Sequence, residues 1–230
     1  MYCKLGKSYL QYIIPTKTRS RWSPGYYRVP RISPDGSRFV VDTAGPADPS
    51  DIWMYDLKSG TTTRFTFDPA VDAHPVWSPD GARVAFLSWR DGFGLYSKDA
   101  FGSGDVEVLV TRPSNISTQQ FTPNGEALIA YEPDPVTESN IVILDVAGER
   151  TIRPLIQMAF SEHSASLSPD GRWLAYSSTE SGRYEIYVRP FPKSAVNGKF
   201  RQTRAPNRLG GRTCLTAAAT TTSLLTAHGS

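Results

Sequence analysis

The chain has 230 residues, with 25 Lys or Arg against 22 Asp or Glu and only two cysteines. Cys3 and Cys214 both lie in atypical end segments, so neither a disulfide framework nor a cysteine-rich zinc site is indicated. No apolar run approaches the length of a membrane span, and Tyr9 to Ile14 is too short for a signal-peptide core. We therefore expect no membrane insertion.

Charge is distributed unevenly along the chain. Residues 1–34 and residues 186–230 each contain seven Lys or Arg and no acid, whereas residues 35–185 hold 11 basic and 22 acidic side chains. Basic ends could bind nucleic acid or a membrane, or they could lie outside the fold. We favour the second interpretation, because neither end interleaves basic with aromatic residues. Residues 1–30 are therefore assigned as an atypical basic segment, and no nucleic-acid partner is expected.

A tetrapeptide of turn-forming residues recurs four times in the middle of the chain. Its starts are separated by 45, 44 and 46 residues, and a fixed period of that size indicates a repeat architecture. Proline at the second position presets φ, Asp or Asn at the third bonds the local backbone, and glycine at the fourth takes a positive φ. Such a turn joins two antiparallel strands. The predicted turn residues are Pro34, Asp35, Gly36, Pro79, Asp80, Gly81, Pro123, Asn124, Gly125, Pro169, Asp170 and Gly171.

Strand-like segments surround each of these turns. In the second repeat, Pro75–Trp77 precedes the turn, Val84–Leu87 follows it, and Phe93–Ser97 comes after a polar loop. A fourth, weaker strand closes the unit, and no segment shows helical periodicity over a helical length. Four strands in about 45 residues make one blade of a β-propeller. We predict an all-β propeller of about four four-stranded antiparallel blades, incomplete as given.

The period also sets the expected domain boundaries. The predicted blades cover 31–68, 72–112, 116–158 and 162–203. A fifth turn is due near residue 213, but residues 204–230 are a low-complexity Ala/Thr tail that we expect to be disordered, and out-of-frame translation would explain it. A closed six-bladed propeller at this period needs about 270 residues. Four blades leave exposed edges, and these are expected to permit self-association.

Two segments resemble known families. The string from His74 to Phe86 resembles the PD40 repeat of TolB-like propellers, related to the repeats of tricorn-type and prolyl-oligopeptidase-type propellers. The string from Tyr184 to Pro192 is similar to a strand of propellers attached C-terminally to bacterial serine/threonine protein kinases. The resemblance covers residues 31–203. It implies that the chain is a module of a larger bacterial protein, for example a serine/threonine protein kinase. It also favours a location on the extracytoplasmic (periplasmic) side of the membrane.

The motifs of common enzymes are missing from the sequence. There is no Gly-x-Ser-x-Gly elbow, no His-Glu-x-x-His motif and no set of kinase motifs. We predict a non-catalytic module without cofactor or metal, which serves protein interaction or sensing through a protein or peptide partner. Two alternatives stay open from the resemblance: the gating propeller of a prolyl-oligopeptidase-like serine peptidase, and a TolB-like envelope scaffold.

Candidate binding residues lie just before two of the turns. His74 and His163 come four and five residues before the second and fourth turns, beside Asp72 and Glu162. These four residues could form a channel rim that contacts a ligand, a metal or a partner peptide. Alternatively, the histidines are strand-entry residues that bond the neighbouring blade, and we favour this structural role. Asp42, near a Pro/Gly-rich loop, is expected to be a solvated loop acid.

Overall fold

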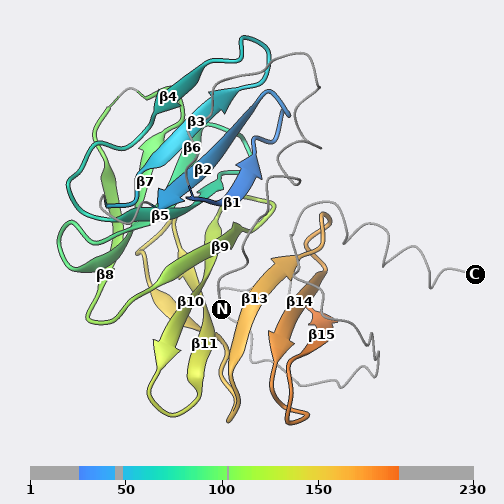
Figure 1. The fold of residues 1–230 in the computed structure, drawn as a ribbon. Helices are drawn as coiled ribbons and strands as arrows, with labels where there is room; N and C mark the ends of the chain where they lie inside the picture. Colours follow the sequence, from blue (N-terminus) through green and yellow to red (C-terminus); the bar gives the residue numbers. More distant parts are fainter. Residues whose placement is uncertain (1–25, 45–48, 103, 192–230) are drawn as a thin grey trace, which may run out of the picture. The chain divides into compact units, whose positions relative to one another are not determined.

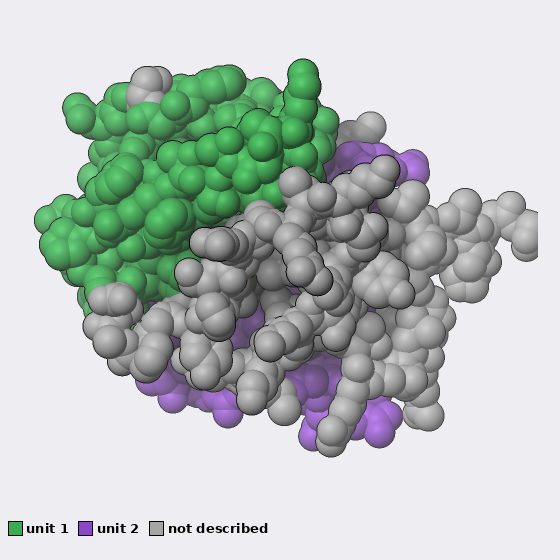
Figure 2. Space-filling model, turned by 45° about the horizontal axis from the view of Figure 1, so that its top comes forward, with its two compact units in different colours: residues 1–113 green, residues 114–230 purple. Residues whose placement is uncertain are grey.

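The computed structural model describes residues 26–44, 49–102 and 104–191, which contain fifteen β-strands and no helix (Figure 1). Two compact units divide the chain, residues 1–113 and residues 114–230 (Figure 2). Within the described residues, no helix exists that is long and apolar enough to cross a membrane. The predicted all-β class is confirmed.

Unit 1 contains two four-stranded antiparallel sheets, each a simple meander in chain order. The strands of the first sheet are β1 (Tyr26–Ile32), β2 (Arg38–Ala44), β3 (Ile52–Asp56) and β4 (Thr62–Arg64). Those of the second sheet are β5 (Asp72–Trp77), β6 (Arg83–Ser88), β7 (Phe93–Asp99) and β8 (Glu107–Arg112). The first strand begins at Tyr26, five residues before the blade start expected at residue 31.

Unit 2 repeats the same plan with a four-stranded and a three-stranded sheet. The strands of its first sheet are β9 (Ser117–Phe121), β10 (Ala127–Asp134), β11 (Glu138–Asp145) and β12 (Ile152–Ile156). Those of its second sheet are β13 (Glu162–Leu167), β14 (Trp173–Ser178) and β15 (Glu185–Pro190). A fourth strand for this last sheet, expected before residue 203, falls outside the described residues, as do the predicted tail 204–230 and most of residues 1–30.

The four tetrapeptides each form the same hairpin turn between the first two strands of a sheet. The glycine N–H donates to the carbonyl of the first residue at 2.8–2.9 Å, and each glycine has φ between 66° and 75°. A Cβ atom placed on Gly81 would lie 3.6 Å from the Pro34 ring, and one placed on Gly171 would lie 3.3 Å from the Pro123 ring. In each unit, the glycine of the second turn therefore packs against the proline of the first turn, and the contact is tighter than usual at Gly171.

The first strand of every sheet is interrupted by a β-bulge. In β5, Ala73 pairs with Leu87 and Val76 with Ala85, so that two residues oppose one on β6. Similar register shifts occur in β1, β9 and β13. A bulge bends a strand and redirects its side chains. Each sheet therefore presents the residues before its turn in a distorted segment.

Apolar packing between the two sheets forms the core of each unit. In unit 1, side chains of β2 to β4 pack on β5 to β7 through Val40, Ile52, Phe65, Trp77, Val84, Phe86, Tyr96 and Ala100. In unit 2, the core consists of Ala127, Ile129, Ile141, Ile143, Leu155, Ile156, Ala165, Leu167, Leu174, Tyr176 and Phe191. A blade cannot bury its apolar face alone, so neighbouring sheets depend on each other for stability.

A buried cation joins the two sheets of each unit. Lys98 of β7 donates from Nζ to the carbonyl oxygen of Phe65 at 3.0 Å. Arg189 of β15 donates from Nη2 to the carbonyl oxygen of Leu155 at 2.7 Å. Phe65 and Leu155 are 90 residues apart (155 − 65). The two units therefore use the same device at corresponding positions, which supports a residue-by-residue comparison between them.

Candidate functional site

The sheets that begin with β5 and β13 match each other over their first two strands, where equivalent residues differ by 90 in number. Their turns start at Ser78 and Ser168, and equivalent backbone bonds run from Trp89 N to Val71 O at 3.0 Å and from Thr179 N to Ser161 O at 3.2 Å. Two of the sequence candidates, Asp72 and Glu162, therefore occupy the same place in the two sheets (162 − 72 = 90). Both are 0% exposed.

Asp72 is held by a complete set of partners. Nη2 of Arg90 donates to both carboxylate oxygens, at 3.0 and 3.1 Å, and Nε of Arg90 donates to the Ser88 hydroxyl at 2.9 Å. Arg90 also lies 3.8 Å from an Asp68 oxygen and stands over the Tyr96 ring. Burial raises the pKa of Asp72, and hydrogen bonds from Ser88 and the charge of Arg90 oppose that shift. The result is a buried ion pair in which one guanidinium nitrogen contacts both carboxylate oxygens.

Glu162 has a different environment. The N–H of residue 180 donates to Ser178 Oγ at 3.2 Å, just as the N–H of Arg90 donates to Ser88 Oγ at 3.3 Å, so the two residues correspond. Residue 180, however, is a glutamate. Oε2 of Glu162 accepts only a long bond of 3.5 Å from the Met158 N–H, and Oε1 has no hydrogen-bond partner among the described residues. The pKa of Glu162 is raised to about 7, mainly by burial and in smaller part by the charge of Glu180.

His163 lies next to Glu162 but points to a separate set of neighbours. Its ring packs on Tyr184 at 4.7 Å between centroids, and Nδ1 is 3.0 Å from Ser164 Oγ. Burial lowers its pKa. In the register of its sheet His163 pairs with Ser177, whereas the residue at the bulge with positive φ is Ser164. His163 is thus one position away from the counterpart of His74.

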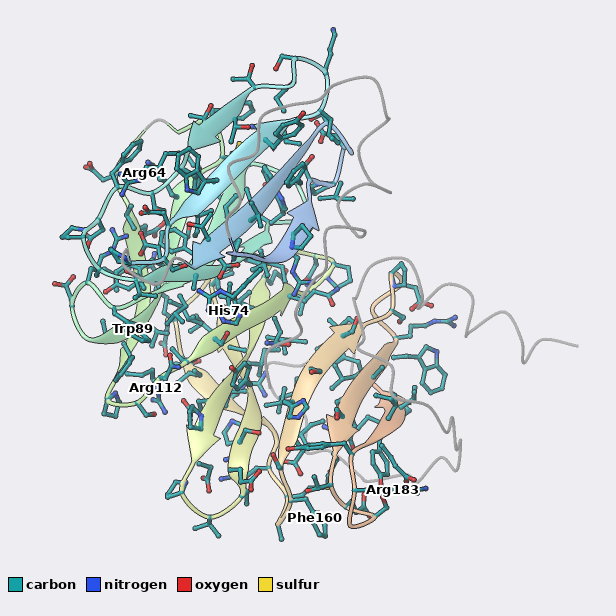
Figure 3. All side chains as sticks on the ribbon, in the orientation of Figure 1. Arg64, His74, Trp89, Arg112, Phe160 and Arg183 are labelled. Atoms are coloured by element: carbon teal, nitrogen blue, oxygen red, sulfur yellow. The ribbon has the colours of Figure 1, made fainter. Side chains whose placement is uncertain are left out.

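His74 occupies the bulge of β5 with φ of 54° (Figure 3). It belongs to a charged group in unit 1, here called the basic cluster, which consists of Arg28, Arg31, Asp42 and His74. Nε of Arg28 lies 3.2 Å from an Asp42 oxygen, and Nη2 of Arg28 donates to Ser50 Oγ at 3.1 Å. The cluster joins β1, β2 and β5, so it spans both sheets of the unit.

Burial and mutual charge set the protonation of the basic cluster. Desolvation raises the pKa of Asp42 to about 6, and Arg28 is the main group that opposes this. The pKa of His74 is lowered to about 4, mainly by desolvation and in smaller part by the charges of Arg28 and Arg31. At pH 7 the cluster therefore holds two guanidinium groups, one carboxylate and a neutral imidazole, which leaves a surplus of one positive charge.

Sequence reasoning selected Asp72, His74, Glu162 and His163, and the structure places them in four different environments. Sequence reasoning did not find Arg28, Arg31, Arg90 or Glu180, because these residues lie on other strands and turns, separated in the sequence from the four candidates. Asp42 was expected to be solvated and is instead 1% exposed, because it lies within β2 opposite Arg28. In the described part of the chain, no three His, Cys, Asp or Glu side chains form a group that could hold a metal ion.

Comparison with known families gives a match over most of the chain. The family described as "TolB beta propeller domain", PD40, matches residues 6–203. The Tol-Pal system protein TolB of Helicobacter pylori strain 26695 is 34% identical and matches over 76% of this chain and 40% of its own length. The peptidase YuxL of Bacillus subtilis is 26% identical over 69% of this chain and 31% of its own length. The chain thus spans less than half of either relative.

Solved structures show the same fold at low sequence identity. TolB from Acinetobacter baumannii aligns with a TM-score of 0.61 at 22% identity, over 72% of this chain and 41% of its own. Puromycin hydrolase aligns with a TM-score of 0.56 at 16% identity, over 69% of this chain and 26% of its own. At these identities the likeness concerns the fold alone.

Proposed function

Because the chain belongs to the PD40 family of TolB β-propeller domains, we propose that it is a non-catalytic module for protein interaction. In this proposal the basic cluster binds a carboxylate of a protein or peptide partner. The observation that carries it is the surplus positive charge fixed by Arg28, Arg31, Asp42 and His74 across two sheets. Function in such folds depends on the site, so the charge of this site sets the expected ligand.

The geometry of Arg28 supports a role in binding. Its side chain is 29% exposed, while its Asp42 partner is 1% exposed, so the guanidinium is anchored on one side and reachable on the other. A guanidinium has five N–H donors. Nη2 of Arg28 donates to Ser50 and Nε lies against Asp42 as an ion pair, so the remaining donors suit a second carboxylate. Charge-assisted pairs of this type are strong and directional. The blades of a propeller surround a channel, and first strands such as β1 and β5 are edge strands of their sheets.

Three contexts compete for the parent protein. The TolB relatives favour an envelope scaffold with protein partners, on the extracytoplasmic side. The match to the peptidase YuxL favours a propeller beside a hydrolase domain. The strand from Tyr184 to Pro192 favours a kinase-linked sensor. Translation of the DNA that flanks the coding segment separates them: a downstream Gly-x-Ser-x-Gly domain supports the peptidase, and an upstream kinase domain supports the sensor.

The binding role is tested with the full chain and paired substitutions. Peptides are selected by display on the wild-type chain at pH 7. Their affinities are then measured for Arg28→Gln with Asp42→Asn, which removes both charges of the Arg28–Asp42 pair. We expect selected peptides to carry a carboxylate and to bind this double variant at least tenfold more weakly.

The matched control is the double variant Arg83→Gln with Glu107→Gln, which removes a partly exposed ion pair of 2.7 Å elsewhere in unit 1. It should leave the affinities unchanged. Equal binding by wild type and the Arg28/Asp42 variant would contradict the assignment of the basic cluster. Peptide hydrolysis by the purified chain, lost on a single substitution, would contradict the non-catalytic role.

A further inference from the structure

The second buried acid, Glu162, carries an inference that rests on the proposed role in protein interaction. We infer that Glu162 and Glu180 form a binding site for a guanidinium group, supplied by an arginine side chain of a partner protein. The site would lie at the start of β13, beside the turn between β14 and β15. It is separate in the chain from the basic cluster, which lies in unit 1.

The corresponding position in unit 1 shows what this site is built to hold. There the guanidinium of Arg90 bonds both oxygens of Asp72, and only 15% of the Arg90 side chain is exposed. The backbone around Glu162 is the same, since Thr179 bonds Ser161 as Trp89 bonds Val71. Unit 2 thus retains the acid and the backbone of the pair, but a second acid stands where the arginine is.

The hydrogen bonding of Glu162 points to a missing donor. The side chain is fully buried, and Oε1 accepts no hydrogen bond from the described residues. A buried charge without a partner costs several kcal/mol, so such groups are normally paired or neutral. Glu180 is half-buried at the hairpin turn, and its charge acts on Glu162.

The charges around Glu162 are not balanced from within the unit. Besides burial, which is the largest cause of the raised pKa of Glu162, the charge of Glu180 raises this pKa and the charge of Arg189 lowers it by the smallest amount. The guanidinium of Arg189 donates to the Leu155 carbonyl, where it joins the two sheets. Tyr176, near Arg189, has its own pKa raised by burial and is neutral at pH 7. A cation from outside the unit would therefore meet two carboxylates and little competition.

The chemistry favours a guanidinium over a metal ion. The described residues provide no third carboxylate, histidine or cysteine at this place, and divalent cations require more oxygen ligands. A guanidinium needs only a planar pair of acceptors, and it can bond one carboxylate with two parallel N–H groups. Two carboxylates with one orphaned oxygen match that need.

The test uses the full chain and small probes of matched shape. N-acetyl-arginine amide is titrated at pH 8, and N-acetyl-citrulline amide, which is neutral, is the control. The amide resonances of Met158 and Glu180 are followed by NMR. We expect saturable shifts with the arginine probe alone, and affinity that falls at least about tenfold at pH 5, where Glu162 is protonated.

Variants complete the design. Glu162→Gln and Glu180→Arg should abolish the shifts, the second because it supplies the guanidinium internally. Glu185→Gln, which removes an acid of the same sheet from its pair with exposed Arg183 (Figure 3), should bind like the wild type. Cooperative unfolding at a melting temperature no lower than that of the wild type verifies that the variants are folded.

Three results would overturn the inference: equal response to both probes, wild-type binding by Glu162→Gln, or saturation of the same resonances by Ca²⁺ but not by the arginine probe. The peptide affinities of the Arg28/Asp42 variant are measured in parallel. If those affinities fall while the Met158 and Glu180 resonances do not move, the guanidinium site is wrong and the proposed function stands.

Discussion

Asp72 and Glu162 occupy the same structural position in the two units, and their surroundings neutralise them in opposite ways. Around Asp72 the chain provides its own cation, Arg90, with two hydrogen bonds to the carboxylate. Around Glu162 it provides a second acid, Glu180, whose charge adds to the rise that burial causes in the pKa of Glu162. The comparison shows that the repeat fixes the burial of an acid, whereas the group that compensates its charge varies with the turn.

The largest effect should come from removing the cation in unit 1. Arg90→Met leaves Asp72 buried and unpaired and should lower the free energy of unfolding by about 3 kcal/mol at pH 7. Glu180→Met, at the corresponding position, should stabilise or be neutral at that pH because it removes a like charge. Chemical denaturation of both variants measures the contrast. Similar losses in the two variants would break the comparison.

Glu162→Gln should raise the free energy of unfolding at neutral and higher pH, whereas the loss of a buried, paired charge normally lowers it. The pKa of Glu162 is raised from 4.5 to about 7, so its stabilising contribution is complete below about pH 4.5 and is lost as pH rises to about 7. Above pH 7 the variant should therefore be more stable than the wild type by about 2 kcal/mol, and near pH 4 the advantage should vanish. Unfolding free energies between pH 4 and 8 test this; a constant difference would contradict it.

A smaller difference is expected at the turn glycines. Alanine at Gly81 or Gly171 would be strained by the positive φ, at a cost of about 1 kcal/mol. At Gly171 the new Cβ would also lie 3.3 Å from the Pro123 ring, compared with 3.6 Å to Pro34 at Gly81. Gly171→Ala should therefore lower the melting temperature more than Gly81→Ala. The reverse order would show that the sheet contact at the turn is looser in unit 2.

The smallest effect concerns His74. Its pKa is lowered from 6.5 to about 4, so the wild type should lose stability as pH falls from 6.5 to 4, when the unfolded chain takes up the proton first. Asn tolerates the positive φ at this bulge and does not titrate. His74→Asn should therefore remove about 1 kcal/mol of acid sensitivity, measured by denaturation at pH 7 and pH 4.5. An unchanged pH dependence would place the titration elsewhere.

The fold could be predicted from the sequence because turn chemistry is local. The Pro-Asp-Gly spacing located the hairpins, and the strand-like segments on either side of each turn located the strands. The bulge at His74 and the partners of Asp72 and Glu162 could not be predicted, because they depend on register and on residues such as Arg28, 46 positions before His74 in the chain. The sequence does show Arg90 and Glu180 at equivalent positions 90 residues apart. This difference indicates different partners only once Asp72 and Glu162 are known to be buried.

Titration of the Glu162 carboxyl by NMR tests the comparison most directly. With selective ¹³C labelling of glutamate and the Glu162→Gln spectrum for assignment, the pKa of Glu162 should be about 7 in the wild type. In Glu180→Arg, which recreates the arrangement of Arg90 and Asp72, it should fall below that value by at least about 2 units. A wild-type pKa near 4.5, unaffected by Glu180→Arg, would contradict the account.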